Sequence, residues 1–416
     1  MAAPAAAPAH APGAASAAAV GIAVVGASLG GLRAAEQLRA AGWRGAITVF
    51  GDEPHLPYNR PPLSKQVLAG EVPAGATRLR RRPSVEDVEW RLGVAVASAD
   101  LAARTLTLAD GSAYVYEGLV AATGVRPRRL PLTGGPPRHV LRTLEDSAAL
   151  AAGLVAGARV LVIGSGFIGC EVAATARTAG CDVTVVAPEA EPMLLAVGED
   201  LARALRRRHE ARGVRFLMGR STVEFTPHSA VLDDGTEVPA DLVVEAVGSR
   251  PNTEWLAATP GLDLTDGVLC DAHLRVGGLP HAVAVGDVAR FPNPRYGPVP
   301  RRVEHWSVPG DTARHAARTL VAGLTGTARP DPAPFAPLPS FWSDQYALRL
   351  QSFGQPSLAD HCHLLQGDPT APEGDLLYAY YQNEHLIAIT ALGGPTATTA
   401  ASHHRAHLLP LPEPTP

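Results

Sequence analysis

Cysteine is scarce in this sequence, and long apolar runs are absent. The 416 residues include four cysteines, and none lies in a C-x-x-C or C-x-x-x-x-C pair. This scatter argues against a disulfide framework, a zinc site and a redox-active dithiol. We expect free thiols, buried in a protein of the reducing cytoplasm, and no segment is apolar enough to span a bilayer. The four are Cys170, Cys181, Cys270 and Cys362.

A surplus of positive charge is missing as well. The formal net charge is −4, whereas nucleic-acid binders usually carry a basic excess, so we expect neither a nucleic-acid nor a membrane partner. The length suggests roughly two to four domains. Residues 1–18 are almost entirely Ala and Pro and lack the basic start of a signal peptide, so they are predicted to be a disordered tail.

Two segments repeat one pattern. Gly21–Phe50 and Arg159–Val186 each predict a buried strand, a Gly-rich turn, a helix and a second β-branched strand. They start about 138 residues apart, too far for a solenoid and suited to a duplicated domain. The predicted fold class is therefore α/β, with two Rossmann-type dinucleotide-binding domains.

The second repeat carries a complete dinucleotide fingerprint. Its first glycine permits a tight turn, its second lets the backbone approach a pyrophosphate, and its third packs the helix on the strand. The N–H groups at the start of the helix would face the phosphates. The residues are Gly164, Ser165, Gly166, Phe167, Ile168 and Gly169.

The first repeat has a weaker fingerprint. Gly26 and Gly31 are present, but Ser28 replaces the second glycine, and its hydroxyl could offer a hydrogen bond in place of close backbone approach. Asp52 follows Gly31 by 21 residues, where a carboxylate would accept hydrogen bonds from a ribose. Without that spacing, Asp52 would equally be an acid of a surface turn.

The remaining pattern predicts how the chain is divided. The first dinucleotide domain would comprise residues 19–128 and 251–328, with the second, residues 129–250, inserted into it, and a small α+β domain would follow at 329–416. Arg126–Pro137 and Gly248–Asn252 are predicted crossovers, and Thr325–Pro339 a Pro-rich linker. Further strands are predicted within Val94–Ala97, Tyr116–Ala122, Asp241–Val247, Ala282–Val285, Trp342–Phe353 and Leu376–Leu392.

One string makes a family resemblance specific. Pro57–Lys65 reads PYNRPPLSK and closely resembles the PY(D/E)RPPLSK segment of the FAD-dependent ferredoxin reductases. These form the branch of the pyridine nucleotide-disulfide oxidoreductase superfamily that contains putidaredoxin, rubredoxin and aromatic-dioxygenase reductases. The resemblance spans residues from about 20 to 395, with further landmarks in order at Ala122–Gly124, Val285–Asp287, Arg302–Trp306 and Phe341–Tyr346.

The resemblance implies a role for individual residues. Lys65 would lie near the flavin N5 and pair with Glu171 beside the nicotinamide, and Trp306 would lie next to the isoalloxazine; these are the expected catalytic residues. Asp287 would bind the ribityl chain and Arg60 the phosphates. The expected FAD contacts are Gly26, Ser28, Gly31, Asp52, Arg60, Lys65, Val96, Thr123, Gly124, Arg128, Asp287 and Trp306. Those expected for NAD are Gly164, Gly166, Phe167, Ile168, Gly169, Glu171 and Gly248.

Three positions depart from the family pattern near the nicotinamide. Ala187 stands where NADH-using members usually place Glu. No Arg or Lys lies nearby to bind a 2′-phosphate, and Glu189 and Glu191 would repel one, so NADH is favoured over NADPH. Glu245 interrupts an apolar strand, where a carboxylate is costly unless paired. Pro309 lies in a changed segment that starts a helix.

These features support three hypotheses. The first is an NADH-dependent reductase that passes electrons from FAD to a ferredoxin-type iron–sulfur protein feeding an oxygenase. The second is the same scaffold recruited as an FAD-dependent tailoring enzyme, with NADH use weakened or lost. The third is a non-enzymatic flavoprotein, against which Lys65, Glu171 and Trp306 argue. The chain would be a monomer or a homodimer, and Arg301, Arg302 and Arg314 are candidates for a ferredoxin-binding patch.

Overall fold

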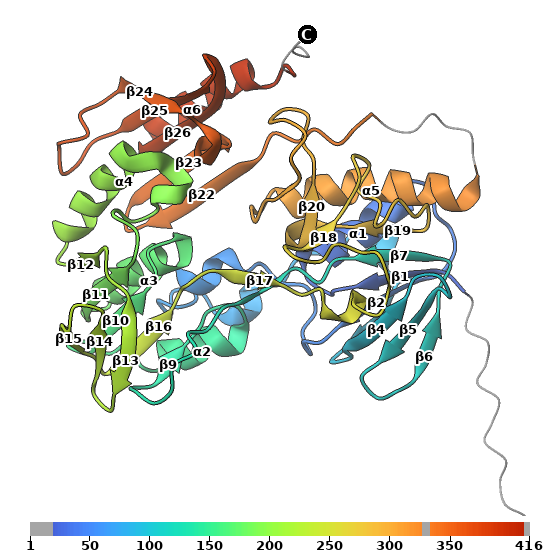
Figure 1. The fold of residues 1–416 in the computed structure, drawn as a ribbon, viewed down its shortest axis with the longest axis horizontal. Coiled ribbons are helices and arrows are strands. Elements are labelled where there is room, and N and C mark those ends of the chain that lie inside the picture. Colours follow the sequence, from blue (N-terminus) through green and yellow to red (C-terminus); the bar gives the residue numbers. More distant parts are fainter. Residues whose placement is uncertain (1–19, 327–332, 412–416) are drawn as a thin grey trace, which may run out of the picture.

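The computed structural model describes residues 20–326 and 333–411, and contains three units built on separate sheets (Figure 1). The predicted tail at 1–18 and part of the predicted linker lie outside the described residues. The two α/β units lie side by side, and the third is stacked on the second. The predicted fold class is confirmed.

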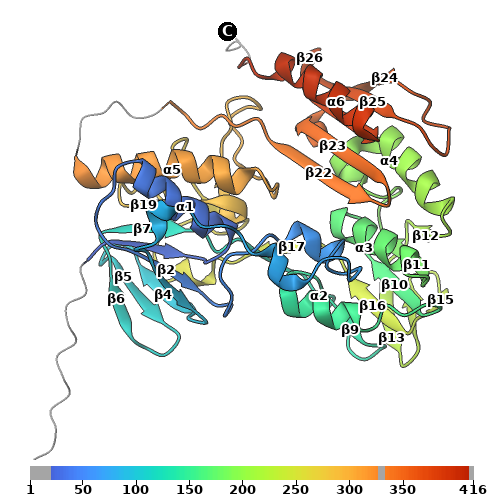
Figure 2. The ribbon, with the colours of Figure 1, turned by 180° about the vertical axis from the view of Figure 1, so that it is seen from behind.

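The first unit is a five-stranded parallel sheet in which β1 pairs with β2 and β7 on its two sides. All four side chains of β1 are buried, as its apolar sequence predicts. Helices α1 (Leu29–Ala40) and α5 (Val308–Thr325) pack against each other on one face (Figure 2). In sheet order the strands are β19 (Ala282–Ala284), β7 (Gly118–Ala121), β1 (Ile22–Val25), β2 (Ile47–Gly51) and β3 (Glu89–Leu92).

Two small sheets flank this one. They are β4–β5–β6 and β18–β20–β21. The predicted strand Val94–Ala97 is shifted, because the chain enters β4 only at Val96. The strands are β4 (Val96–Asp100), β5 (Thr105–Leu108), β6 (Ala113–Val115), β18 (Val268–Leu269), β20 (Ala289–Phe291) and β21 (Arg301–Arg302).

The second unit repeats the parallel arrangement. Its strands in order are β12 (Arg215–Met218), β11 (Asp182–Ala187), β10 (Arg159–Ile163), β16 (Leu242–Glu245) and β9 (Arg138–His139). A small antiparallel sheet adds β13 (Thr222–Thr226), β14 (Ser229–Leu232) and β15 (Glu237–Pro239). The helices are α2 (Leu144–Ala151), α3 (Phe167–Thr178) and α4 (Leu194–Glu210).

The chain passes between these units in a two-stranded ribbon, visible at the centre of Figure 1. Strands β8 (Val125–Pro127) and β17 (Ser249–Pro251) pair antiparallel. The two predicted crossovers therefore lie side by side and form the connection between the units.

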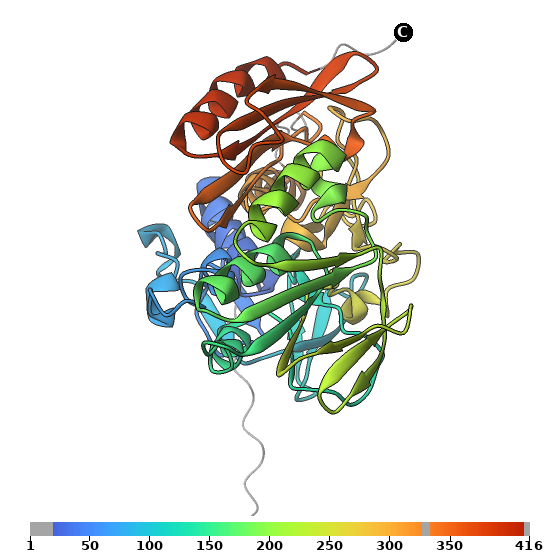
Figure 3. The ribbon, with the colours of Figure 1, turned by 90° about the vertical axis from the view of Figure 1, so that its left-hand side faces the viewer.

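The third unit is an antiparallel sheet covered by α6 (Pro395–His404). The predicted stretch Trp342–Phe353 is two strands, because the chain turns at Tyr346, whose φ is 57°. The unit shares a core with α4, and its first strand packs on α3 (Figure 3). In order the strands are β22 (Ser340–Gln345), β23 (Leu348–Gly354), β26 (His385–Gly393), β25 (Leu376–Gln382) and β24 (His361–Gln366).

Seven short 3-10 helices complete the described chain. They are Pro61–Ser64, Ala74–Thr77, Pro83–Val85, Glu254–Leu256, Gly286–Val288, Pro356–Leu358 and Arg405–Leu408. Among the helices in the described ranges, none combines the length and apolarity needed to cross a bilayer. Cys170, Cys181 and Cys270 are buried free thiols, as predicted, whereas Cys362 is only half-buried.

Candidate functional site

The first Gly-rich turn can only be built from glycine at two positions. Gly26 has φ +118°, and a Cβ there would lie 2.1 Å from the carbonyl oxygen of Ala122. A Cβ on Gly31 would lie 1.9 Å from the carbonyl oxygen of Gly26. Ser28 precedes α1 without capping it through its side chain, and no acid occupies the first turn. The first N–H groups of α1 are thus available to an anion.

The second turn repeats this geometry. Gly164 has φ +100° and would place a Cβ 2.2 Å from the carbonyl oxygen of Ala246, and Gly169 would place one 2.0 Å from Gly164. A Cβ on Gly166 would meet nothing within 4 Å, so open space lies over the backbone there. Space above the middle glycine and an uncapped helix start are what a pyrophosphate needs.

Asp52 lies just beyond β2 and is exposed, at the position expected for a ribose ligand. Its neighbour Glu53 contacts other side chains. One oxygen of Glu53 lies 2.5 Å from Arg60, and the other accepts a hydrogen bond from Tyr58. The Arg60 guanidinium also donates to the carbonyl of Arg142 at 2.6 Å, so it is anchored within the protein.

Arg142 is a candidate cofactor ligand that sequence reasoning missed. It follows the first crossover, yet its guanidinium lies 3.8 Å from the Asp287 carboxylate. The same guanidinium lies 3.5 Å from the position that a Cβ on Gly124 would take. Burial raises the pKa of Asp287 to about 6, although the positive charge of Arg142 lowers it. An arginine and a carboxylate in this position can hold a polar ligand between the two α/β units.

Lys65 and Glu171 meet as expected. Their charged atoms are 2.6 Å apart, with 10% and 5% of the side chains exposed. Ser64 donates to the same carboxylate oxygen as Lys65, and Ser343 donates to the other at 2.7 Å. Lys65 is the only lysine of the chain, whose other long cationic side chains are all arginine.

Trp306 lies on the surface, beside the loop that carries Lys65. Its side chain is 42% exposed, packs edge-on against Trp342, and donates from Nε1 to Asn59 at 2.9 Å. Asn59 belongs to the same loop as Lys65. The partly exposed indole can therefore cover a ligand or contact a protein partner.

The other expected contacts are distributed along the connection between the units. Thr123 donates to the carbonyl of Asn252, and the Arg128 amide donates to Gly248 across the ribbon at 2.9 Å. Val96 begins β4 and packs on the core of the first unit. Thr123, Arg128 and Gly248 thus hold the connection together, in addition to any cofactor contact.

Aromatic rings join the three units beside the second fingerprint. The ring centroid of Phe341, from β22, lies 5.0 Å from that of Phe167 at the start of α3. It also lies 5.0 Å from the ring centroid of His305. Ile168 is exposed at 39%. The apolar side chains around the second turn can thus contact a flat ring.

Two expectations about the ribose end of the second unit need correction. The expectation that no arginine lies nearby is wrong. Arg220 is distant in the sequence, but its amide donates to the carbonyl of Ala187 at 3.0 Å. The guanidinium of Arg220 contacts Asp234 at 2.8 Å. Glu191 does not stand free to repel a phosphate, since its carboxylate faces Arg203 and Arg206 at 3.8 and 3.7 Å.

The buried Glu245 is paired. Arg138 lies 2.7 Å from one carboxylate oxygen and Arg129 lies 3.5 Å from the other. Arg138 also donates to the Leu130 carbonyl and stacks on Phe225. Glu245 thus fixes the crossover to the sheet. Pro309 lies in the first turn of α5, where a missing N–H has no cost.

The candidate arginines for partner binding are largely compensated. Arg302 contacts Asp266 and Glu304, and Arg314 contacts Asp311. Arg301 donates to two backbone carbonyls. A positively charged patch there would rest chiefly on Arg301.

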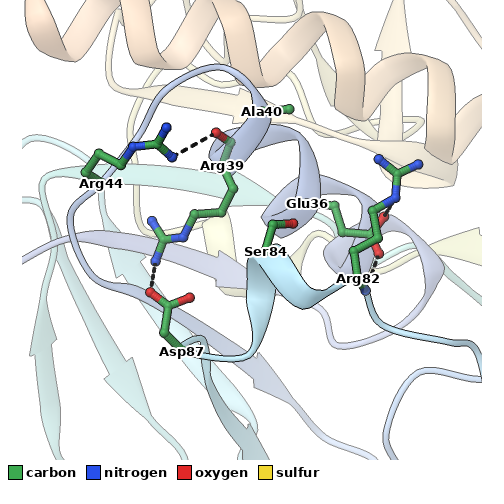
Figure 4. A pocket seen from close by; sticks show the side chains of 7 residues that line it. All are labelled: Glu36, Arg39, Ala40, Arg44, Arg82, Ser84 and Asp87. Carbon is green, nitrogen blue, oxygen red and sulfur yellow. Dashed lines mark hydrogen bonds and ion pairs between the residues drawn. The ribbon is translucent and has the colours of Figure 1, made fainter.

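A separate hollow of about 360 Å³ lies at the far end of α1 (Figure 4). Its charged side chains bond within the protein: Arg39 contacts Asp87 at 2.8 Å, and Arg82 contacts the buried Glu36 at 3.5 Å. Arg44 donates to the carbonyl of Arg39. This cluster joins α1 to the following loops and has no link to the two Gly-rich turns.

Comparisons with known proteins agree with this geometry. The family model described as pyridine nucleotide-disulphide oxidoreductase matches residues 20–313, and the one described as reductase C-terminal matches residues 340–407. The chain is 36% identical over 381 residues to the ferredoxin–NAD(+) reductase component of the p-cumate 2,3-dioxygenase system of Pseudomonas putida, covering 89% of this chain and 90% of that protein. It is 35% identical to putidaredoxin reductase of Pseudomonas putida, over 89% and 88% of the two chains.

A solved structure shares this arrangement of units. The covalent putidaredoxin reductase–putidaredoxin complex superposes with a TM-score of 0.83 at 32% identity, over 92% of each chain. The chain belongs to the pyridine nucleotide-disulphide oxidoreductase family.

Proposed function

We propose that this protein is an FAD-dependent ferredoxin reductase that takes electrons from NADH and passes them to a ferredoxin-type iron–sulfur protein of an oxygenase system. The observation that carries the proposal is the buried Lys65–Glu171 pair beside two dinucleotide turns. A chain that otherwise uses arginine has one lysine, at the position where a compact ammonium would approach a flavin. Close relatives of nearly equal length are named as reductase components of this kind.

The residues divide into those that hold FAD and those that hold NADH. The first turn, with Gly26, Ser28 and Gly31, would bind the FAD pyrophosphate at the start of α1. The second, with Gly164, Gly166 and Gly169, would bind that of NADH at the start of α3. Further FAD contacts are assigned to Asp52, Arg60, Val96, Thr123, Gly124, Arg128, Arg142, Asp287 and Trp306, and further NADH contacts to Phe167, Ile168, Glu171 and Gly248.

Bound FAD supplies the conversion of a two-electron hydride into single electrons. Lys65 provides a positive charge next to the ring system, and Glu171 holds the ammonium in place. Phe167 and Phe341 supply apolar surface for the nicotinamide and limit the water around it. The loop Leu56–Leu68 contains no cysteine, so electrons leave without a dithiol.

The tailoring-enzyme alternative is not favoured. It rested on Ala187, Glu245 and Pro309, and the structure gives Glu245 and Pro309 ordinary structural explanations. A steady-state assay separates the two hypotheses: purified holoenzyme with NADH and cytochrome c, with and without putidaredoxin as a probe acceptor. We expect reduction that depends on the iron–sulfur protein. A rate unchanged by its addition would argue against the proposal.

A further inference from the structure

Glu171 accepts hydrogen bonds from two directions. Lys65 and Ser64, from the first unit, face its Oε2, and Ser343, from the third unit, donates to its Oε1. Glu171 is 4% exposed, and Ser64 and Ser343 are at most 1% exposed. Among the hydrogen bonds of the described residues, the Oε1 atom of Glu171 therefore receives its bond from the third unit alone.

Behind Ser343 the hydrogen bonds continue inward. Gln345 donates from Nε2 to Ser343 Oγ at 3.0 Å and to the sulfur of Met193 at 3.6 Å. Its Oε1 lies 2.6 Å from Nε2 of His209, and Nδ1 of that ring lies 3.3 Å from the Tyr346 hydroxyl. Gln345 is 2% exposed, and His209 is fully buried.

The Glu171 carboxylate determines which group donates and which accepts in each hydrogen bond from Ser343 to Tyr346. Ionised Glu171 can only accept, so the single Ser343 proton must point at it, and Ser343 must accept from the Gln345 amide. The amide oxygen of Gln345 then faces His209, whose Nε2 must donate, leaving Nδ1 to accept from Tyr346. Burial lowers the pKa of His209 to about 4, so the ring is neutral near neutral pH and fits this assignment.

We propose that Ser343, Gln345 and His209 form a positioning chain through which the third unit holds the Glu171 carboxylate in the orientation that pairs it with Lys65. The inference rests on the proposed function, which assigns the Lys65–Glu171 pair to the flavin. His209 comes from α4 of the second unit and Gln345 from β22 of the third, so the chain also joins these two units. These three are positioning residues, because none touches the reacting atoms.

The only lysine of the chain provides the readout. Protein grown with lysine labelled at Cε gives a single lysine signal by NMR, and that signal reports on the surroundings of Lys65. Ser343→Ala removes the donor without adding bulk. Ser352→Ala is the matched control, because Ser352 is equally buried in the neighbouring strand and bonds to Thr390 instead.

In the holoenzyme, we expect Ser343→Ala to shift the lysine signal, Ser352→Ala to leave it in place, and Gln345→Leu to shift it less than Ser343→Ala. Glu171→Gln should shift the signal and make a second change at Ser343 nearly silent. The turnover rate of Ser343→Ala with NADH should fall about tenfold with little change in KM. Thermal unfolding of each variant establishes that it is folded.

An identical signal in wild type and Ser343→Ala, or an equal shift in Ser352→Ala, would overturn the positioning chain. Equal shifts from Ser343→Ala in the wild-type and Glu171→Gln backgrounds would do so too. The NMR measurement uses no NADH, so it stands apart from the proposed function. If NADH failed to reduce the wild-type flavin, the proposed function would be wrong, but the NMR result would still test the positioning chain.

Discussion

The ammonium of Lys65 lies 2.6 Å from the carboxylate of Glu171, which joins the loop after β2 of the first unit to helix α3 of the second. Both side chains are nearly buried, so the charges are shielded from water and their interaction is strong. The pair lies where the two α/β units and the third unit meet, and its consequences can be measured.

The first prediction concerns the chemical identity of the cation. Lys65→Arg keeps the positive charge but replaces a compact ammonium with a planar guanidinium that does not fit the same space. We expect FAD to remain bound and the rate constant of flavin reduction by NADH to fall about 100-fold. Stopped-flow absorbance at the flavin band measures this. A wild-type rate in Lys65→Arg would mean that only charge matters at this position.

A second prediction concerns the ribose end of the second unit. Ala187→Glu places a carboxylate at the end of β11, where it can accept hydrogen bonds from the adenosine ribose and repel a 2′-phosphate. We expect KM for NADH to fall about tenfold and activity with NADPH to decrease. The Arg220 amide bonds to Ala187 and its guanidinium contacts Asp234, so we expect this guanidinium to be the cation that a 2′-phosphate would meet, and Arg220→Gln should lower NADPH activity alone. Unchanged KM values in both variants would place the ribose elsewhere.

The third prediction concerns the buried ion pair that fixes the crossover. Arg138→Met leaves the buried Glu245 carboxylate with the longer contact to the half-exposed Arg129, and should destabilise the protein by about 3 kcal/mol. The double variant Arg138→Met with Glu245→Leu removes both charges and should recover most of this loss. Urea unfolding of the four proteins measures the cycle. Additive losses would show that the two residues are not coupled.

The fourth prediction concerns pH. Burial raises the pKa of Asp287 from 3.8 to about 6 in the folded protein, so folding favours the protonated form. In the FAD-free protein this contribution to stability is present at low pH and is lost as pH rises from about 4 to about 6. Asp287→Asn should remove that loss, and be more stable than wild type near pH 7 by roughly 2 kcal/mol. Urea unfolding at several pH values measures the free energy of unfolding of both proteins. If this free energy changed with pH in the same way in wild type and Asp287→Asn, the prediction would be wrong.

The local parts of the site could be predicted from the sequence. Glycines such as Gly26 and Gly164 reveal a turn because their positive φ is a conformation that other residues rarely adopt, and recognising this needs no knowledge of distant residues. The string around Lys65 carried the resemblance, and the predicted pair with Glu171 is present.

Contacts between distant segments could not be predicted in the same way. Arg142 reaches Asp287 and Ser343 reaches Glu171 only because separate units pack together, and Arg220 reaches Ala187 only because β12 pairs with β11 within the second unit. No periodicity or spacing encodes these contacts. Likewise, Glu245 is an acid in an apolar strand, and its partner Arg138 lies far from it in the sequence.

The most direct test of the electron path is an anaerobic titration of the holoenzyme with NADH, followed by addition of oxidised iron–sulfur protein. The account predicts that about one equivalent of NADH bleaches the flavin band, that NADPH does so more slowly, and that the band returns as the iron–sulfur protein is reduced. A flavin band that NADH leaves unchanged would contradict it.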